Sequence, residues 1–279
     1  MLSARLQVFA AAVLFSTGGA AIKSIQLTAW QVAGFRAGLA ALAILLFLPA
    51  ARRMFDRRIL LAGIAYAAMG LTFVAANKYT TAANAIFLQD TAPVYMMALS
   101  PLLLKEAVPR RDRVFLVLMA AGAAMFFAGD PAPSLTAPDP ARGNLIALAS
   151  AAAWASTIAA LRWMEKSGIE GQPGMATVAM GNLLAFGASL PWALPVASIS
   201  ARDAGVLAYL GFVQIALGYA LFTRGVKHAS GMEASVIMMC EPALCALWAF
   251  LIHGETPAPW GLAGGAVILA ATAGRVLFR

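Results

Sequence analysis

Two prolines stand inside long apolar stretches of this chain, and each has a carboxylate close by. Asp90 precedes Pro93 by three residues, and Glu241 directly precedes Pro242. A proline inside a helix removes one backbone donor and clashes with the carbonyl four residues earlier. Within a membrane, a carbonyl freed in this way must be satisfied by protein or by a wet cavity. The two prolines therefore predict a pair of hinges that face a solute site.

The charged side chains near these hinges could recognise a solute or carry a proton. A charge at the centre of a bilayer costs at least roughly 2.5 kcal/mol, so Asp90 and Glu241 are expected to face the interior of a helix bundle. There they would bind an ammonium group or titrate as proton couplers. Lys78 would attract a substrate carboxylate or extend to the lipid headgroups. Arg36 is expected to cap loop carbonyls or to pair with a carboxylate, which is a structural role.

Other side chains within the apolar stretches are candidates for the wall of a cavity. Tyrosine and tryptophan can stack on a substrate while offering a polar edge. Amide and hydroxyl groups could bond a substrate or a neighbouring helix, and methionine adapts to varied shapes as well as packing in cores. The predicted cavity residues are Trp154, Tyr95, Tyr79, Tyr219, Gln89, Asn84, Gln214, Ser235 and Met238.

These residues need helices that hold them within a membrane, and the composition predicts such helices. Hydrophobic residues make up 62% of the chain, charged residues 11%, and the mean hydropathy is +0.81. A soluble domain carries about 25% charged residues. Ten stretches approach the roughly 20 apolar residues that cross a bilayer. They are 6–22, 28–49, 59–77, 82–104, 114–129, 143–163, 173–195, 204–222, 232–252 and 259–277. We therefore expect an all-α, polytopic membrane protein.

The basic residues indicate how these spans are oriented. The net charge is +8, but the charges lie in short clusters between apolar stretches, which does not favour a nucleic-acid partner. With a cytoplasmic N-terminus, most of the 20 lysines and arginines fall in cytoplasmic loops, as the positive-inside rule requires. We expect a multi-pass protein of the inner membrane with both termini in the cytoplasm.

The two halves of the chain carry a faint repeat. A shift of 149 positions superposes three pairs: Lys78 with Lys227, Pro93 with Pro242, and Glu106 with Glu255. Five spans per half is an odd number, so the second copy would enter the membrane upside down, as in many secondary transporters. The expected units are a first repeat at 1–130, a proline-rich linker at 131–142 and an inverted second repeat at 143–279.

The same residues resemble a known family. A Gly-Phe-Arg sequence at 34–36 and a pattern of proline, glutamate and proline in each half carry this resemblance. The two copies of the pattern are Pro93, Glu106 and Pro109, and Pro242, Glu255 and Pro257. The chain resembles the EamA family of the drug/metabolite transporter (DMT) superfamily, and within it the YddG-type amino-acid exporters. The resemblance implies a ten-helix basket with a central substrate cavity, and export of amino acids and other metabolites.

These features predict a secondary transporter that exports amino acids, aromatic or otherwise neutral, and related small metabolites. It would work by alternating access across the bacterial inner membrane. No Walker-type Gly-x-x-x-x-Gly-Lys-Ser/Thr motif is present, so ATP is not the expected direct energy source. No cofactor or metal is expected. The expected partners are a small-molecule substrate and membrane lipid, and a monomer is expected, with a dimer as the alternative.

Two other functions remain open at this point. Proton-coupled efflux of hydrophobic cations is the first, although small multidrug pumps rely on a glutamate in their first helix and residues 6–22 contain no acid. An intramembrane enzyme is the more remote one. It would need a nucleophile with a base, or a metal cluster, at membrane depth. The chain has only two histidines, His228 and His253, near helix ends in opposite halves, so an enzyme is not expected.

Overall fold

The fold is described from a computed structural model, which covers residues 2–52, 56–128, 133–167 and 173–277. Within these ranges the chain is helical, and the only β-type pairing is an isolated bridge between Ser134 and Ala137. The first two residues of the predicted linker, 131–132, lie outside the described residues, as do residues 129 and 130 before it. The expected all-α architecture is confirmed.

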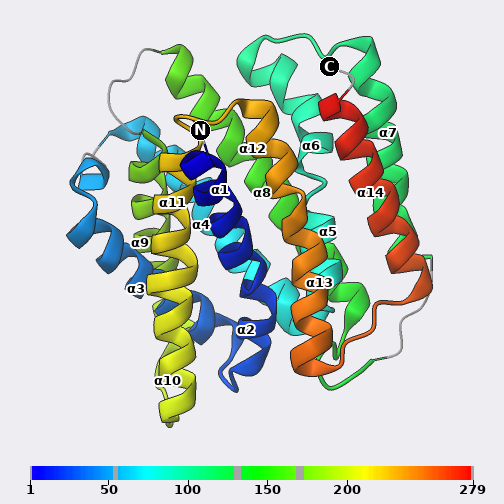
Figure 1. Cartoon of the computed structure of the whole chain (residues 1–279). Coiled ribbons are helices and arrows are strands. Elements are labelled where there is room, and N and C mark those ends of the chain that lie inside the picture. The colour runs from blue at the N-terminus through cyan, green and yellow to red at the C-terminus, as the bar shows by residue number, and fades with distance from the viewer. Residues whose placement is uncertain (1, 53–55, 129–132, 168–172, 278–279) are drawn as a thin grey trace.

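The helices follow one another along the chain with short connections (Figure 1). The first half contains α1 (Leu2–Ser16), α2 (Gly18–Ser24), α3 (Ala29–Phe47), η1 (Pro49–Arg52), α4 (Arg57–Tyr79), α5 (Ala82–Gln89), α6 (Ala92–Leu99), η2 (Ser100–Leu104) and α7 (Arg110–Met125). The second half contains α8 (Pro140–Lys166), α9 (Pro173–Ala193), α10 (Ala201–Ala208), η3 (Tyr209–Leu217), α11 (Gly218–Gly225), α12 (Gly231–Met238), α13 (Cys240–His253) and α14 (Pro259–Leu277).

Among the residues that the structure describes, eight helical stretches are long and apolar enough to cross a membrane. They are Ser3–Ser24, Ala29–Phe47, Arg57–Tyr79, Pro140–Lys166, Pro173–Ala193, Ala201–Gly225, Met232–His253 and Pro259–Leu277. The predicted spans at 82–104 and 114–129 fall short of this description. The first is divided into α5, α6 and the π-helical turn η2, and α7 has only 16 residues. The chain is thus a polytopic helical protein in which the fourth predicted span is an interrupted helix.

Part of the repeat seen in the sequence has a counterpart in the backbone. A shift of 149 positions carries α5 (Ala82–Gln89) onto α12 (Gly231–Met238), with the same bounds. Thr81 and Ser230, which correspond under this shift, are the N-caps of these two helices, and each side chain accepts a hydrogen bond from the third residue of its helix. A hydroxyl in this position satisfies an amide that has no partner within the helix.

The backbone conformations directly before Glu106 and Glu255, the two glutamates of the repeat, also correspond. Lys105 and Gly254 have left-handed backbone conformations, with φ of 54° and 66°. The amides of the following glutamates donate to carbonyls six residues earlier: Glu106 to Ser100 at 3.2 Å, and Glu255 to Ala249 at 3.3 Å. The two glutamates therefore occupy the same local backbone geometry, one in each half.

The first span of each half runs in the opposite direction to the other. Arg5, near the start of α1, pairs with Glu233, and Lys23, near the end of α2, pairs with Glu255. By contrast, α8 begins beside the end of α4 and ends beside η2, where Lys166 donates to the carbonyl of Leu104 at 3.1 Å. The start of α1 and the end of α14 lie at one end of the bundle in Figure 1. We call this the Glu106 end, and the opposite one the Glu255 end.

Small residues allow the two halves to pack closely. Gly34 of α3 faces α9, where a Cβ added to it would lie 2.7 Å from the Cβ of Ser189. Four residues later, a Cβ on Gly38 would lie 2.9 Å from the ring of Phe186. The Gly-x-x-x-Gly pair thus packs α3 against α9 of the same chain.

Replacing Gly34 with alanine is expected to destabilise the fold by about 1–3 kcal/mol, because the added methyl overpacks this contact. Gly187→Ala on α9 is the matched control, since a Cβ there meets nothing within 4 Å. The control is expected to be neutral or to stabilise by up to about 1 kcal/mol through helix propensity. Thermal unfolding in detergent compares the two, and equal effects would contradict the close packing of α3 on α9.

Candidate functional site

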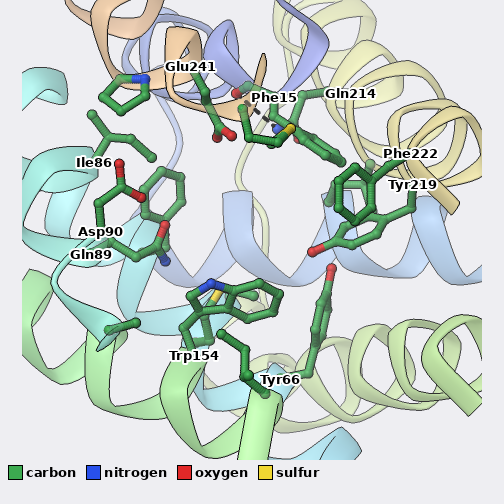
Figure 2. Close-up of a pocket in the computed structure, with 18 of the residues that line it drawn as sticks. Phe15, Tyr66, Ile86, Gln89, Asp90, Trp154, Gln214, Tyr219, Phe222 and Glu241 are labelled. Atoms are coloured by element: carbon green, nitrogen blue, oxygen red, sulfur yellow. Dashed lines mark hydrogen bonds between the residues drawn. The ribbon is translucent and has the colours of Figure 1, made fainter. Parts of the chain in front are cut away.

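A cavity of about 440 Å³ lies between the two halves of the bundle. Its wall includes residues from α1, α3, α4, α8 and α9, and from the interrupted helices α5–α6 and α12–α13. Figure 2 shows Gln89 and Asp90 on one side of this space and Tyr219 and Phe222 on the opposite side. A volume of this size is in the range of pockets that hold small organic molecules.

The interrupted helices reach the cavity at their breaks. α5 ends at Gln89 and α6 begins at Ala92, while α12 ends at Met238 and α13 begins at Cys240. The prolines that follow each break, Pro93 and Pro242, both line the cavity. Proline has no backbone N–H, and its ring clashes with the carbonyl four residues earlier, so it interrupts the helical turn before it. This accounts for a break within the three residues before each proline. The predicted bends are present; whether they act as hinges stays a prediction.

One side of the cavity carries two carboxylates. Asp90 and Glu241 both line it and are half-buried. Neither side chain has a hydrogen-bond or ion-pair partner in the part of the chain that the structure describes. The two are close enough to interact electrostatically. Beside them, the amide of Gln89 donates to the hydroxyl of Ser150 at 2.7 Å, so this amide is held in place by α8.

The other charged group in the cavity is Arg36, which is only 7% exposed. Its guanidinium donates to the carbonyl of Gly70 at 3.4 Å, and no carboxylate of the described residues pairs with it. It interacts electrostatically with Tyr66 and Tyr219. The rings of these tyrosines meet edge to face at 5.9 Å, and their hydroxyls point toward one another in Figure 2. Arg36 and the two phenols form a donor-rich region.

Aromatic rings cover the wall between these polar regions. Phe15 packs against Tyr219 with ring centroids 5.0 Å apart, and against Phe222 at 6.5 Å. Trp154 of α8 also borders the cavity, and Figure 2 shows it beside Tyr66. The cavity therefore combines a cationic region, a carboxylate region and an apolar wall.

The structure brings most of the predicted site residues together. The cavity is lined by Trp154, Tyr219, Gln89, Gln214, Ser235, Met238, Asp90, Glu241, Pro93 and Pro242. The other four predicted residues, Tyr95, Tyr79, Asn84 and Lys78, are not among its lining residues.

Three of these four residues have other partners toward the Glu255 end. The Lys78 ammonium donates to the carbonyl of Ile25 at 2.6 Å. The ring of Tyr79 lies under the guanidinium of Arg142, 4.6 Å from its centroid, and the Asn84 amide bonds Asn144. The fourth, Tyr95, is half-buried on α6.

Sequence reasoning missed several residues of the cavity. Arg36 was expected to have a structural partner, but its one hydrogen bond, to Gly70, is long. Tyr66 and Asn182 also line the cavity, and their polar groups in the middle of apolar stretches are a signal that could have identified them. Phe15 gives no such signal, because a phenylalanine suits lipid and cavity equally.

Comparison with known proteins identifies the family. The model of the EamA-like transporter family matches residues 2–128 and 141–276. One solved crystal structure, whose description names no function, is similar over 99% of this chain and 97% of its own, with a TM-score of 0.64 and 16% sequence identity. At that identity the likeness shows a shared fold only. No curated protein matches. The chain belongs to the EamA-like transporter family of the DMT superfamily, a family of polytopic membrane transporters.

Proposed function

We propose that the protein is a secondary transporter that exports amino acids or related small zwitterions across the bacterial inner membrane by alternating access. In this proposal ten spans form two inverted five-helix repeats with both termini in the cytoplasm. The observation that carries the proposal is that one cavity holds charges of opposite sign, none of which has an ion-pair partner among the described residues. Arg36 lies in its donor-rich region, and Asp90 and Glu241 lie in its carboxylate region.

The chemistry of a zwitterion complements these two regions. The planar guanidinium of Arg36 matches a carboxylate with parallel hydrogen bonds, and the hydroxyls of Tyr66 and Tyr219 add donors. An ammonium group would be neutralised by Asp90 or Glu241. A charge held away from water without a partner is unfavourable, so a solute that supplies both partners gains the most from entering.

The apolar wall offers space for an amino-acid side chain. Trp154, Phe15 and Phe222 present ring faces and edges, which pack against flat or aliphatic groups without requiring a fixed hydrogen-bond pattern. This supports aromatic or other neutral amino acids as the substrates.

The arrangement of the bundle supports alternating access. α1–α2 and α8 run in opposite directions, and α5 and α12 have corresponding bounds and caps. Two such halves can exchange roles, so that one sequence pattern provides both an inward-open and an outward-open state. Several basic residues lie at the Glu106 end, among them Arg5, Arg162, Lys166 and Arg275, which favours that end as the cytoplasmic one.

Proton-coupled efflux of hydrophobic cations is the second candidate. Two carboxylates face one arginine in the cavity, and aromatic rings surround them, which would also suit a flat cation. Transport of labelled amino acids and of cationic dyes in liposomes, with and without a pH gradient, separates the two functions. Movement of dyes alone, and only with a gradient, would favour the second candidate.

Membership of a transporter family makes an intramembrane enzyme the least favoured alternative.

Removing the guanidinium tests the proposed carboxylate site. Arg36→Gln is expected to lower amino-acid uptake into proteoliposomes by about 10- to 100-fold, because hydrogen bonds to a charged group contribute about 1.5–3 kcal/mol each. Arg142→Gln is the control, since this guanidinium stacks on Tyr79 outside the cavity. Equal uptake by the two folded variants would exclude Arg36 from substrate binding.

Neutralising the carboxylates tests the ammonium site. Asp90→Asn and Glu241→Gln are each expected to weaken zwitterion uptake by about tenfold or more, because a charged partner is lost in a poorly solvated site. Glu165→Gln, on an exposed position of α8, should leave uptake unchanged. If transport is proton-coupled, the same two variants also lose the dependence of uptake on a pH gradient. Full uptake by both carboxylate variants would refute the assignment.

The aromatic wall is tested by a pair of truncations. Trp154→Ala is expected to reduce uptake of aromatic amino acids by roughly tenfold through lost ring packing. Tyr95→Ala is expected to have little effect, because Tyr95 does not line the cavity. Uptake rates of the two variants, normalised to folded protein, decide the matter, and a larger loss in the Tyr95 variant would contradict this description of the wall.

A further inference from the structure

The two repeated glutamates each form an ion pair with a lysine of the other half. Glu255, after α13, pairs with Lys23 near the end of α2 at 2.9 Å. Glu106, after η2, pairs with Lys166 at the end of α8 at 2.7 Å, and with Arg162 at 3.0 Å. In both cases the lysine stands at the end of the first span of its half. The two pairs are therefore arranged alike, since each joins the repeated glutamate of one half to the end of the first span of the other half, although Lys23 and Lys166 do not correspond under the shift of 149 positions.

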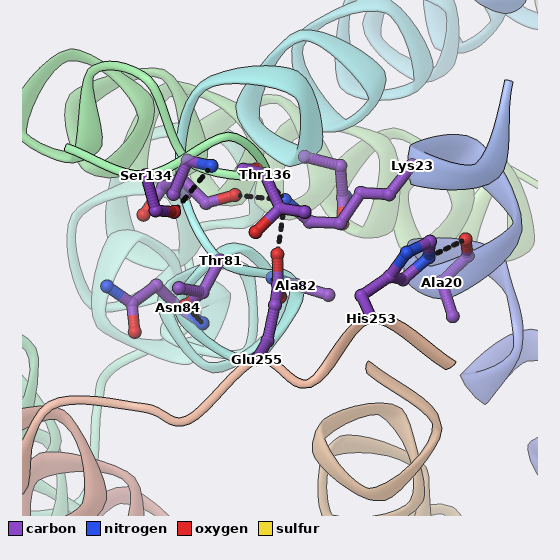
Figure 3. A network of polar contacts seen from close by, with 12 residues as sticks. Ala20, Lys23, Thr81, Ala82, Asn84, Ser134, Thr136, His253 and Glu255 are labelled. Carbon is purple, nitrogen blue, oxygen red and sulfur yellow. Dashed lines mark hydrogen bonds and ion pairs between the residues drawn. The ribbon is translucent and has the colours of Figure 1, made fainter. Parts of the chain in front are cut away.

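These related pairs differ in burial. The side chains of Lys23 and Glu255 are 2% and 4% exposed, whereas those of Lys166 and Glu106 are 49% and 28% exposed. Lys23 also donates to the carbonyls of Thr80, at 2.7 Å, and Thr136. Figure 3 shows this enclosed network. At the other end, the hydrogen bond from Lys166 holds the pKa of the exposed Glu106 carboxyl below its usual range.

The contacts of Asn84 and Glu233, which correspond under the shift of 149 positions, differ in burial in the same way. Asn84 and Glu233 are the third residues of α5 and α12. Asn84 is buried and bonds Asn144 of α8 at 3.2 Å, while Glu233 forms a partly exposed ion pair with Arg5 of α1. Every residue of α5 from 82 to 88 is buried, but among residues 232–238 of α12 only one is. The half-helix α5 is thus more deeply buried in the bundle than its counterpart α12.

The buried pair is connected to the cavity through α5. Glu255 accepts a hydrogen bond from the amide of Ala82 at 2.9 Å, at the first residue of this helix. The other end of α5 carries Gln89, and Asp90 follows it, both in the cavity wall. A helix of eight residues therefore extends from the ion pair to the cavity wall.

We infer that Lys23–Glu255 and Lys166–Glu106 are alternating latches, each of which is buried when its end of the transporter is closed and becomes hydrated when that end opens. The inference rests on the proposed alternating-access function, and it goes beyond it by naming the contacts that hold each end shut. The structure is then the state closed at the Glu255 end. Opening this end exposes one ion pair to water while the related pair at the Glu106 end becomes enclosed.

A native cysteine reports on the closed end. Cys245 of α13 is 2% exposed, and its thiol lies 3.7 Å from the carbonyl of Ala82 in α5 and beside Gly19 of α2. These are the three elements that the Lys23–Glu255 latch joins. In a Cys240→Ala background, the rate at which a polar thiol reagent modifies Cys245 in detergent-solubilised protein measures opening of the Glu255 end. Cys245→Ala gives the background rate.

Glu255→Gln is expected to speed modification of Cys245 by roughly tenfold or more, because removing one partner of a buried ion pair strongly disfavours the closed arrangement. Glu106→Gln is the matched control at the related position, and it should not raise the rate, since it weakens only the other latch. The double variant Lys23→Gln, Glu255→Gln leaves no unpaired charge. It should show the faster rate with a smaller loss of thermal stability. Equal acceleration by Glu255→Gln and Glu106→Gln, or no change in any variant, would overturn the inference.

Transport assays on the same variants separate this inference from the proposed function. If the wild-type protein moves amino acids but Glu255→Gln and Glu106→Gln change the modification rate of Cys245 equally, the latches alone are refuted. If the labelling rates differ as expected but no zwitterion is transported, the proposed substrate class alone is refuted.

Discussion

A charged side chain held away from water needs a partner, and this constraint separates the buried charges of this protein into two groups. Lys23 and Glu255 form an ion pair, and backbone groups of neighbouring segments bond the Lys23 ammonium and one carboxylate oxygen of Glu255. Arg36, Asp90 and Glu241 have no such partner among the described residues and all face one cavity. The first group holds the helices together, whereas the second is available to a ligand. The same physical requirement therefore underlies both the proposed latch at the Glu255 end and the proposed solute site.

The interrupted helices connect these two groups. A continuous helix satisfies its own backbone and presents only side chains, but a break exposes helix ends at membrane depth, which is tolerated where they border a cavity. Pro93 and Pro242 place such breaks on opposite halves of the bundle. The half-helix α5 consequently has the cavity at one end and the Glu255 carboxylate at the other. Binding and closure are joined by one element of eight residues.

The sequence predicted where the helices lie and break more accurately than which side of each helix faces the cavity. Pro93 and Pro242 located the breaks, and the shift of 149 positions anticipated matching helix bounds. Lys78 and Tyr79, in contrast, do not line the cavity. A membrane helix is apolar on all sides, so no amphipathic stripe identifies its inward face. Arg36 was assigned a structural role because a sequence does not reveal which carboxylates lie near it. The unequal burial of Glu106 and Glu255 is a tertiary property, and their similar motifs carry no signal of it.

Two related ends can exchange roles only if the open and closed arrangements differ little in free energy, since each 1.4 kcal/mol changes their ratio about tenfold. Small differences between the repeats then decide which end is closed at rest. Gly254 adopts its left-handed conformation without steric cost, whereas Lys105, at the related position, carries a penalty of about 1–2 kcal/mol. Arg162 gives Glu106 a second, exposed partner, which favours the hydrated form of that pair. Gly254 and Lys105 are both left-handed in the structure, so this penalty does not distinguish the two arrangements. The second partner of Glu106 does, and in the proposed mechanism it favours the state in which the Glu106 pair is exposed to solvent.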